Sequence, residues 1–378
     1  MIAHALPSLL DVRRAADEVY AVMPPTAQYS WPGLNEHVGF EVWIKHENHT
    51  PIGAFKIRGG IVYFNRLRER GDVRGVICAT RGNHGQSIAF NGARTNIRST
   101  IVVPHGNSSE KNAAMRALGA ELVEYGDDFQ ASLDYAHSLA VEEDLHFVPS
   151  YAPELIRGVA TYALEFFESA PQLDVVYVPV GLGSGLAGTL AVRNALGLDT
   201  EVVAVVAEGA PAYARSLEAG RVIEARAETI ADGMACRTPD RDALSLFLAQ
   251  SVRWVRVSEA EIEEAMRLYF TQTHNVAEGA GAASVRSCPA ATSTANCTPA
   301  CWAGRSRRAE AAPLRLGAHF AHVTALDFID EAADAVAVRQ KRMLADACDR
   351  FADGFVDVAE GAECVRRRVA RVGSDRSP

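Results

Sequence analysis

A lysine placed for nucleophilic chemistry is the first functional signal in this sequence. The 378 residues include four lysines, and Lys56 lies in the stretch GAFKIRGG, where a turn precedes a predicted helix. The positive end of the helix dipole and the apolar neighbours Phe55 and Ile57 disfavour its ammonium form. A free amine can form an imine with a carbonyl compound, so Lys56 is a candidate nucleophile, although a solvated helix lysine is the alternative.

A second motif, TRGNH at residues 80–84, follows a predicted strand and begins a predicted helix. Successive free backbone N–H groups at such a position can hold a carboxylate. The Asn83 amide can also hydrogen-bond a ring hydroxyl. A plain surface turn is the competing interpretation. The candidate carboxylate-binding residues are Thr80, Arg81, Gly82, Asn83 and His84.

A third motif, GLGSG at residues 181–185, also lies between a predicted strand and a predicted helix. Glycines let the backbone approach an anion, Ser184 adds a hydroxyl, and the helix N-terminus favours a dianionic phosphate. The spacing fits neither a P-loop nor a GxGxxG dinucleotide motif. The candidate phosphate-binding residues are Gly181, Leu182, Gly183, Ser184 and Gly185.

The elements that must position these motifs alternate between strand and helix from about residue 40 to residue 285, which predicts a mostly parallel α/β fold. A helix is predicted within residues 108–120, opened by capping serines and stopped by Gly119. Another is predicted at residues 258–273, with Ser258 as its N-cap and Glu261 completing a capping box. Strands are predicted at residues 75–79, 99–103, 174–179 and 201–207.

The three motifs in this order resemble those of the fold type II pyridoxal-phosphate enzymes, and within them the threonine/serine dehydratases, with serine racemase as a relative. The resemblance covers roughly residues 15–285. It implies that Lys56 is the Schiff-base lysine and the base. A bulky residue at Gly183 or Gly185 is expected to weaken cofactor binding, because a Cβ would crowd the phosphate. The implied residues around pyridoxal 5'-phosphate are Phe55, Lys56, Asn83, Gly181, Leu182, Gly183, Ser184, Gly185, Gly233 and Glu278.

The resemblance also implies a fold and an activity. The fold is tryptophan synthase β-like, with two parallel-sheet α/β domains and the cofactor between them. The larger domain is expected to comprise residues 1–48 and 151–285, and the smaller, substrate-gripping domain residues 49–150. The implied activity is β-elimination of threonine or serine to a 2-oxo acid and ammonia, with the carboxylate of the substrate held by residues 80–84.

Two positions depart from the family pattern. Arg81 stands where serine racemase carries a serine acid/base, and a guanidinium stays protonated, so elimination is favoured over racemisation. Arg81 could instead pair with the carboxylate on Cα or with a second carboxylate on the substrate side chain, or it could face solvent. A second carboxylate makes 3-hydroxyaspartate ammonia-lyase an alternative. Some relatives bind a divalent cation through a glutamate and an acidic residue six positions later. Glu208 is present, but the residue six positions after it is Ala214, which cannot bind a cation, so we expect no complete metal site.

The largest departure is at the C-terminus. The family's Ser/Thr-Gly-Gly-Asn motif, which contacts the pyridine nitrogen, is absent from residues 285–378. Residues 286–326 lack an apolar period, and residues 327–378 are expected to be a helical or disordered tail. This region is either a linker with an appendage or a stretch translated out of the ancestral reading frame. The second interpretation makes a catalytically impaired remnant a further alternative.

Composition narrows the function classes. Lys and Arg number 38 against 47 Asp and Glu, a net charge of −9, which argues against nucleic-acid binding. The sequence has no long uncharged apolar run, so no membrane partner is expected. The seven cysteines show no metal or redox spacing, and we expect free thiols and a cytoplasmic location. The expected partner is a small amino-acid substrate, with a homodimer expected if the C-terminal region folds.

Overall fold

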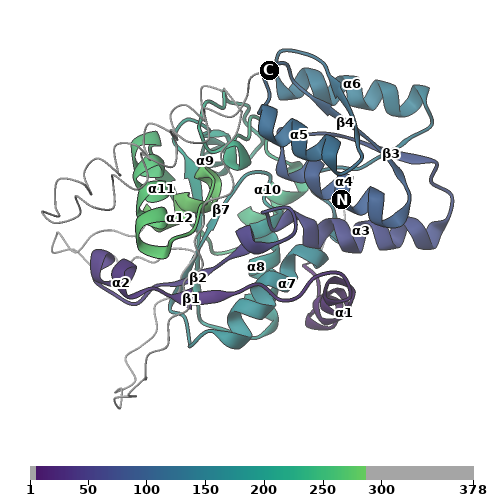
Figure 1. Cartoon of the computed structure of the whole chain (residues 1–378). Helices are drawn as coiled ribbons and strands as arrows, with labels where there is room; N and C mark the ends of the chain where they lie inside the picture. The colour runs from purple at the N-terminus through teal and green to yellow at the C-terminus, as the bar shows by residue number, and fades with distance from the viewer. Residues whose placement is uncertain (1–5, 287–378) are drawn as a thin grey trace, which may run out of the picture. The chain divides into compact units, whose positions relative to one another are not determined.

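The computed structural model describes residues 6–286, in which two parallel sheets are surrounded by helices (Figure 1). The strands are β1 (Gln28–Ser30), β2 (Trp43–Lys45), β3 (Gly75–Ala79), β4 (Arg98–Val103), β5 (Glu121–Glu124), β6 (His146–Phe147), β7 (Val175–Pro179), β8 (Glu201–Ala207) and β9 (Arg253–Val257). The helices are α1 (Leu9–Tyr20), α2 (Pro32–Val38), α3 (Lys56–Arg70), α4 (Asn83–Thr95), α5 (Ser109–Ala117), α6 (Phe129–Glu142), α7 (Pro153–Ser169), α8 (Ser184–Ala195), α9 (Ala212–Ala219), α10 (Arg241–Leu248), α11 (Glu259–Thr273) and α12 (Gly279–Arg286).

The first parallel sheet has four strands in the order β5-β4-β3-β6. The central strand β3 is buried along its whole length, and Cys78 lies opposite Ile101 of β4. Burial of apolar side chains on both faces is typical of parallel sheets covered by helices. Helices α4 and α6 pack against β3 and β4, and α4 begins four residues after β3 ends.

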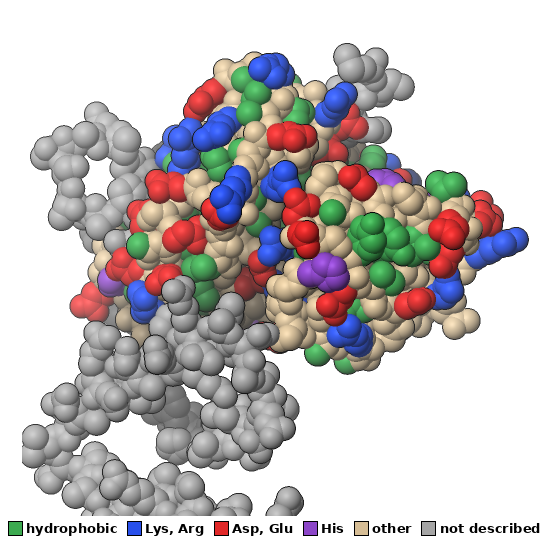
Figure 2. All heavy atoms as spheres, turned by 90° about the horizontal axis from the view of Figure 1, so that it is seen from above, with side chains coloured by type: hydrophobic (Ala, Val, Ile, Leu, Met, Phe, Trp, Pro, Cys, Tyr) green, Lys and Arg blue, Asp and Glu red, His purple; other side chains and the backbone are tan. Residues whose placement is uncertain are grey.

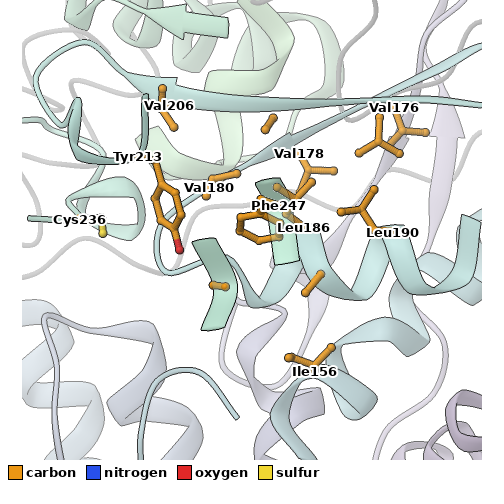
Figure 3. Close-up of a cluster of buried hydrophobic side chains, with 14 of the residues drawn as sticks. Ile156, Val176, Val178, Val180, Leu186, Leu190, Val206, Tyr213, Cys236 and Phe247 are labelled. Atoms are coloured by element: carbon orange, nitrogen blue, oxygen red, sulfur yellow. The ribbon is translucent and has the colours of Figure 1, made fainter. Parts of the chain in front are cut away.

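The second parallel sheet has the order β7-β8-β9, and it contains the largest apolar core. Leu186 and Leu190 of α8 lie against Val176 and Val178 of β7, as Figure 3 shows. Each such fully buried side chain contributes about 1.5–3 kcal/mol relative to exposure. This packing fixes the position at which β7 ends and α8 begins, which is where the glycine-rich loop lies.

A buried ion network fixes the start of α3. The guanidinium of Arg58 is fully buried and donates to the carboxylates of Glu47 and Glu165 at 2.5–2.9 Å. Lys45 of β2 donates to Glu165 at 2.5 Å. Two buried cations and two carboxylates therefore compensate one another, and breaking such a pair is far costlier than losing a surface pair. The network holds the helix that carries Lys56 against α7 and β2.

The fold class and the main elements agree with the sequence predictions. The strands predicted at residues 75–79 and 201–207 are confirmed, and the other two begin within one residue of prediction. Ser258 and Glu261 form the expected capping box of α11. The helix predicted to be capped by Ser108 and to stop at Gly119 is confirmed: α5 runs from Ser109 to Ala117, and Gly119 follows its C-cap in a left-handed conformation with φ of +86°.

The domain boundaries remain a prediction, although β3 to β6 all lie within residues 49–150 and β7 to β9 within residues 151–285. The irregular segment at residues 286–326 lies, apart from its first residue, outside the described residues, and so does the tail at residues 327–378.

The surface of the described residues is rich in charged side chains. Figure 2 shows acidic and basic side chains interspersed over one face of the molecule. Many form exposed pairs, such as Arg116 with Glu124 at 3.1 Å. Within this described part of the chain, none of the helices combines the length and the apolar character that crossing a membrane requires.

Candidate active site

One cavity of about 790 Å³ brings the three sequence motifs together. It lies at the carboxyl ends of β3 and β7, where parallel α/β folds place their ligands. The sequence-predicted residues that line it are Phe55, Lys56, Thr80, Arg81, Gly82, Asn83, His84, Gly181, Leu182, Gly183, Ser184, Gly185, Gly233 and Glu278. The structure thus assembles every residue predicted for cofactor and substrate, and their individual roles remain predictions.

Lys56 is the first residue of α3, and its side chain is partly exposed to the cavity. The Nζ atom lies 3.0 Å from the Ser184 hydroxyl oxygen and 5.5 Å from the centre of the Phe55 ring. Desolvation by the surrounding protein lowers the pKa of Lys56 to about 8. A substantial neutral fraction is therefore present near physiological pH, as an amine nucleophile requires.

Residues 80–84 form a compact turn at the end of β3. The Thr80 hydroxyl accepts hydrogen bonds from the backbone N–H groups of Gly82 and Gly85, at 3.0 and 3.3 Å. His84 is buried with Nε2 3.5 Å from the Val148 carbonyl oxygen, and desolvation, reinforced by the charge of Lys56, lowers the pKa of His84 to about 3. Its imidazole therefore stays neutral, and the turn presents backbone N–H groups and the start of α4 to an anion.

The glycine-rich loop owes its path to close backbone contacts. Gly183 has φ of +100°, a left-handed conformation that favours glycine. A Cβ on Gly181 would lie 2.1 Å from the Gly233 carbonyl oxygen, so no side chain fits there. Because α8 begins at Ser184, its first backbone N–H groups lie at the cavity and can hold a phosphate.

Lys111 and Asp232 are among the cavity residues that sequence reasoning missed. The Lys111 ammonium lies 2.9 Å from a Glu278 carboxylate oxygen and 3.3 Å from one of Asp232. Glu278 also accepts a hydrogen bond from Asn83 Nδ2 at 2.5 Å. The rarity of lysine in this chain was the one available signal for Lys111. Asp232 directly precedes Gly233, which the resemblance places near the cofactor, but the resemblance assigns Asp232 no role.

Arg81 and Glu208, the two positions of interest for a second carboxylate and for a metal ion, are both at least partly exposed to solvent. The Arg81 side chain is 40% exposed, and its Nε lies 4.0 Å from an Asp232 carboxylate oxygen. Glu208 is exposed and does not line the cavity. Among residues 6–286, no group of three or more His, Cys, Asp or Glu side chains is arranged to hold a metal ion.

A desolvated amine, a glycine-rich helix start and a compact turn before a second helix lie in one cavity, which is the arrangement expected of a pyridoxal-phosphate enzyme of fold type II. The family model described as "Pyridoxal-phosphate dependent enzyme" matches residues 22–301, so the chain belongs to that family.

The chain is similar to named enzymes of this family. It is 33% identical over 280 residues to the L-threonine ammonia-lyase of Thermotoga maritima, covering 74% of this chain and 70% of that enzyme. It is 30% identical over 288 residues to the catabolic L-threonine dehydratase of Escherichia coli, covering 86% of it. It spans 53% of the biosynthetic enzyme of Pasteurella multocida. The crystal structure of serine racemase from Dictyostelium discoideum superimposes with a TM-score of 0.68 at 26% identity, covering 75% of this chain and 91% of that one.

The residues present fit the cofactor of the family. The start of α8 with Gly183 and Ser184 would hold the phosphate, and Lys56 would bind the aldehyde carbon. Asn83 lies at the cavity with its Nδ2 directed at Glu278, where its amide would meet the ring hydroxyl. Pyridoxal 5'-phosphate supplies a conjugated ring that delocalises negative charge from the substrate Cα.

Proposed function

We propose that this protein is an ammonia-lyase that converts threonine or serine to the corresponding 2-oxo acid and ammonia. The single observation that carries the proposal is the position of the Lys56 amine, 3.0 Å from the phosphate-loop Ser184, in the same cavity as the turn at residues 80–84. The names of the threonine ammonia-lyase and dehydratase relatives support this choice of reaction.

We assign substrate binding and proton removal to different residues of the cavity. The turn at residues 80–84, which ends at the start of α4, binds the substrate carboxylate and orients the Cα–H bond. The neutral Lys56 amine removes the proton from Cα, since its pKa of about 8 matches a base working near neutral pH. The β-hydroxyl then takes up a proton and leaves as water, and the resulting enamine is hydrolysed by water to the 2-oxo acid and ammonia.

The substrate is tested by kcat/KM for threonine, serine and both 3-hydroxyaspartates with the full chain and added cofactor. We expect threonine and serine to exceed both hydroxyaspartates, with 2-oxo acid and ammonia formed in equal amounts. Asp232 lies beside Arg81, and this carboxylate competes with the second carboxylate of a hydroxyaspartate. A preference for hydroxyaspartate would contradict the proposal, and no turnover with any of the four would favour the impaired remnant.

The pKa of Lys56 predicts how cofactor binding depends on pH. Only the neutral amine attacks the aldehyde, so the rate of cofactor incorporation into the apo-protein should rise with pH and level off above about pH 8. Stopped-flow absorbance between pH 6 and pH 10 measures it. A rate still rising tenfold per unit at pH 9 would show a lysine with an ordinary pKa near 10.4 and contradict the desolvated environment.

Arg81 predicts the balance between elimination and racemisation. The wild-type protein should form little D-serine from L-serine, because a guanidinium does not exchange a proton near neutral pH. Arg81→Ser should raise the ratio of D-serine to pyruvate several-fold, by analogy with the serine of serine racemase. Chiral chromatography measures both products, and an unchanged ratio would leave Arg81 without this role.

A cytoplasmic location and a homodimer remain predictions.

A further inference from the structure

Lys111 connects the two sides of the cavity through a chain of polar contacts. Its position two residues into α5 places it on the side of the four-stranded sheet, and its Nζ bridges Glu278 at 2.9 Å and Asp232 at 3.3 Å. The side chain also crosses the carboxylate-binding turn, since a Cβ on Gly82 would lie 2.3 Å from Lys111 Cδ. Glu278 directly precedes α12, and Asp232 begins a 3-10 helix (Asp232–Met234) that packs against α12 on the side of the three-stranded sheet.

Through its contact with Asn83, Glu278 links the Lys111 ammonium to the side chain expected to contact the cofactor ring. The Glu278 carboxylate accepts from Asn83 Nδ2 at 2.5 Å, which fixes which way the amide points. Burial by itself would lower the pKa of Lys111, but the charges of Glu278 and Asp232 outweigh it and raise that pKa. Lys111 therefore remains a cation that holds two carboxylates close together.

Removing that cation affects the two carboxylates unequally. Asp232 still has Arg81 nearby, at 4.0 Å, whereas Lys111 is the cation that the described structure pairs with Glu278. The two carboxylates would then repel each other across the space that the ammonium occupied. Glu278, which is held less firmly, would move and release the Asn83 amide.

We propose that Lys111 is a positioning residue of the cofactor site, which acts through Glu278 to orient the Asn83 amide. The Asn83 amide is then already oriented before pyridoxal 5'-phosphate binds. Binding does not have to order this side chain, which favours affinity. The inference rests on the cofactor site of the family and not on the identity of the hydroxy amino acid, so a wrong substrate assignment would leave it intact.

The test is a double-mutant cycle on the Kd for pyridoxal 5'-phosphate, measured by equilibrium dialysis with the full-length apo-protein. Lys111→Gln and Glu278→Gln should each raise the Kd by about tenfold, the size of a lost charged hydrogen bond. The double variant should be no worse than Glu278→Gln alone, within about twofold. Effects that multiply in the double variant would overturn the route through Glu278.

Further variants separate positioning from a merely structural role. Lys111→Arg keeps the charge and should stay within about threefold of the wild-type Kd. Arg116→Gln, which breaks an exposed pair on the same helix, is the matched control and should leave Kd unchanged. A Lys111→Gln protein with a lower urea midpoint but an unchanged Kd would contradict the proposal.

One variant keeps the test decisive if Lys111→Gln fails to fold. Asp232→Asn retains the pair between Lys111 and Glu278 and should keep the Kd within about twofold of wild type. If Asp232→Asn weakens binding as much as Glu278→Gln does, the bridge as a whole matters and the specific link to Asn83 is wrong.

Discussion

Lys56→Ala should lower turnover of threonine by more than about a thousandfold, because it removes both the covalent anchor and the base at Cα. The other lysines of the described structure do not offer a replacement. Lys45 Nζ donates to Glu165 at 2.5 Å and to the Thr26 carbonyl oxygen at 2.7 Å. Lys111 is held by two carboxylates.

The measurement is the 2-oxo acid formed per enzyme, together with the absorbance of the bound cofactor. Lys111→Gln is the informative comparison, since it removes a different cavity lysine and should keep the imine absorbance at saturating cofactor. Lys56→Ala should lose that absorbance while its unfolding midpoint stays near wild type. Wild-type turnover in Lys56→Ala would remove Lys56 from the reaction.

Gly183→Ala should have the second-largest effect. A Cβ at this position would lie 2.7 Å from the Phe247 ring, and the φ of +100° disfavours any side chain. Backbone strain of this kind costs about 1–3 kcal/mol. We expect apo-protein stability to fall by at least that amount, and the cofactor Kd to rise more than about tenfold, because the start of α8 shifts.

Gly185→Ala is the matched control within the same loop. Its Cβ would lie 3.4 Å from the Tyr162 hydroxyl oxygen, an ordinary contact distance. The motif alone predicts equal crowding at Gly183 and Gly185, whereas the structure separates them for a substitution as small as alanine. Urea unfolding midpoints and the cofactor Kd are measured for both variants. We expect larger changes in Gly183→Ala, and equal changes at the two positions would contradict the difference in backbone contacts.

The sequence predicted the motifs well because each one is local. A strand end, a short turn and a helix start lie within a few residues of one another in residues 75–84 and 174–185, so strand pattern and turn chemistry identify them. The carboxyl ends of parallel strands then bring such turns to one edge, which explains why residues 80–84 and 181–185 line one cavity.

The contacts that were missed join distant parts of the chain. Lys111 is 121 residues from Asp232 and 167 from Glu278, and no local pattern records such a pairing. Short or exposed strands were missed for another reason. Strand β9 (Arg253–Val257) places arginines at exposed positions, and β6 has two residues, so neither gives the apolar run of a buried parallel strand.

The proposal of an altered reading frame concerns residues outside the described part of the chain. The family model extends to residue 301, beyond the last described residue at 286. The coding DNA read in all frames after codon 284 tests it. We expect another frame to encode a strand followed by Ser/Thr-Gly-Gly-Asn, and a fully active, soluble protein made from the present chain would show that the idea is wrong.

The most direct test of the central claim is to locate the cofactor on the chain. The full-length protein is incubated with pyridoxal 5'-phosphate, reduced with borohydride and digested, and the modified lysine is identified by mass spectrometry. The position of Lys56 Nζ beside Ser184 predicts one stoichiometric adduct on Lys56, and prior addition of threonine should suppress it. An adduct on Lys111, or none at all, would contradict the account.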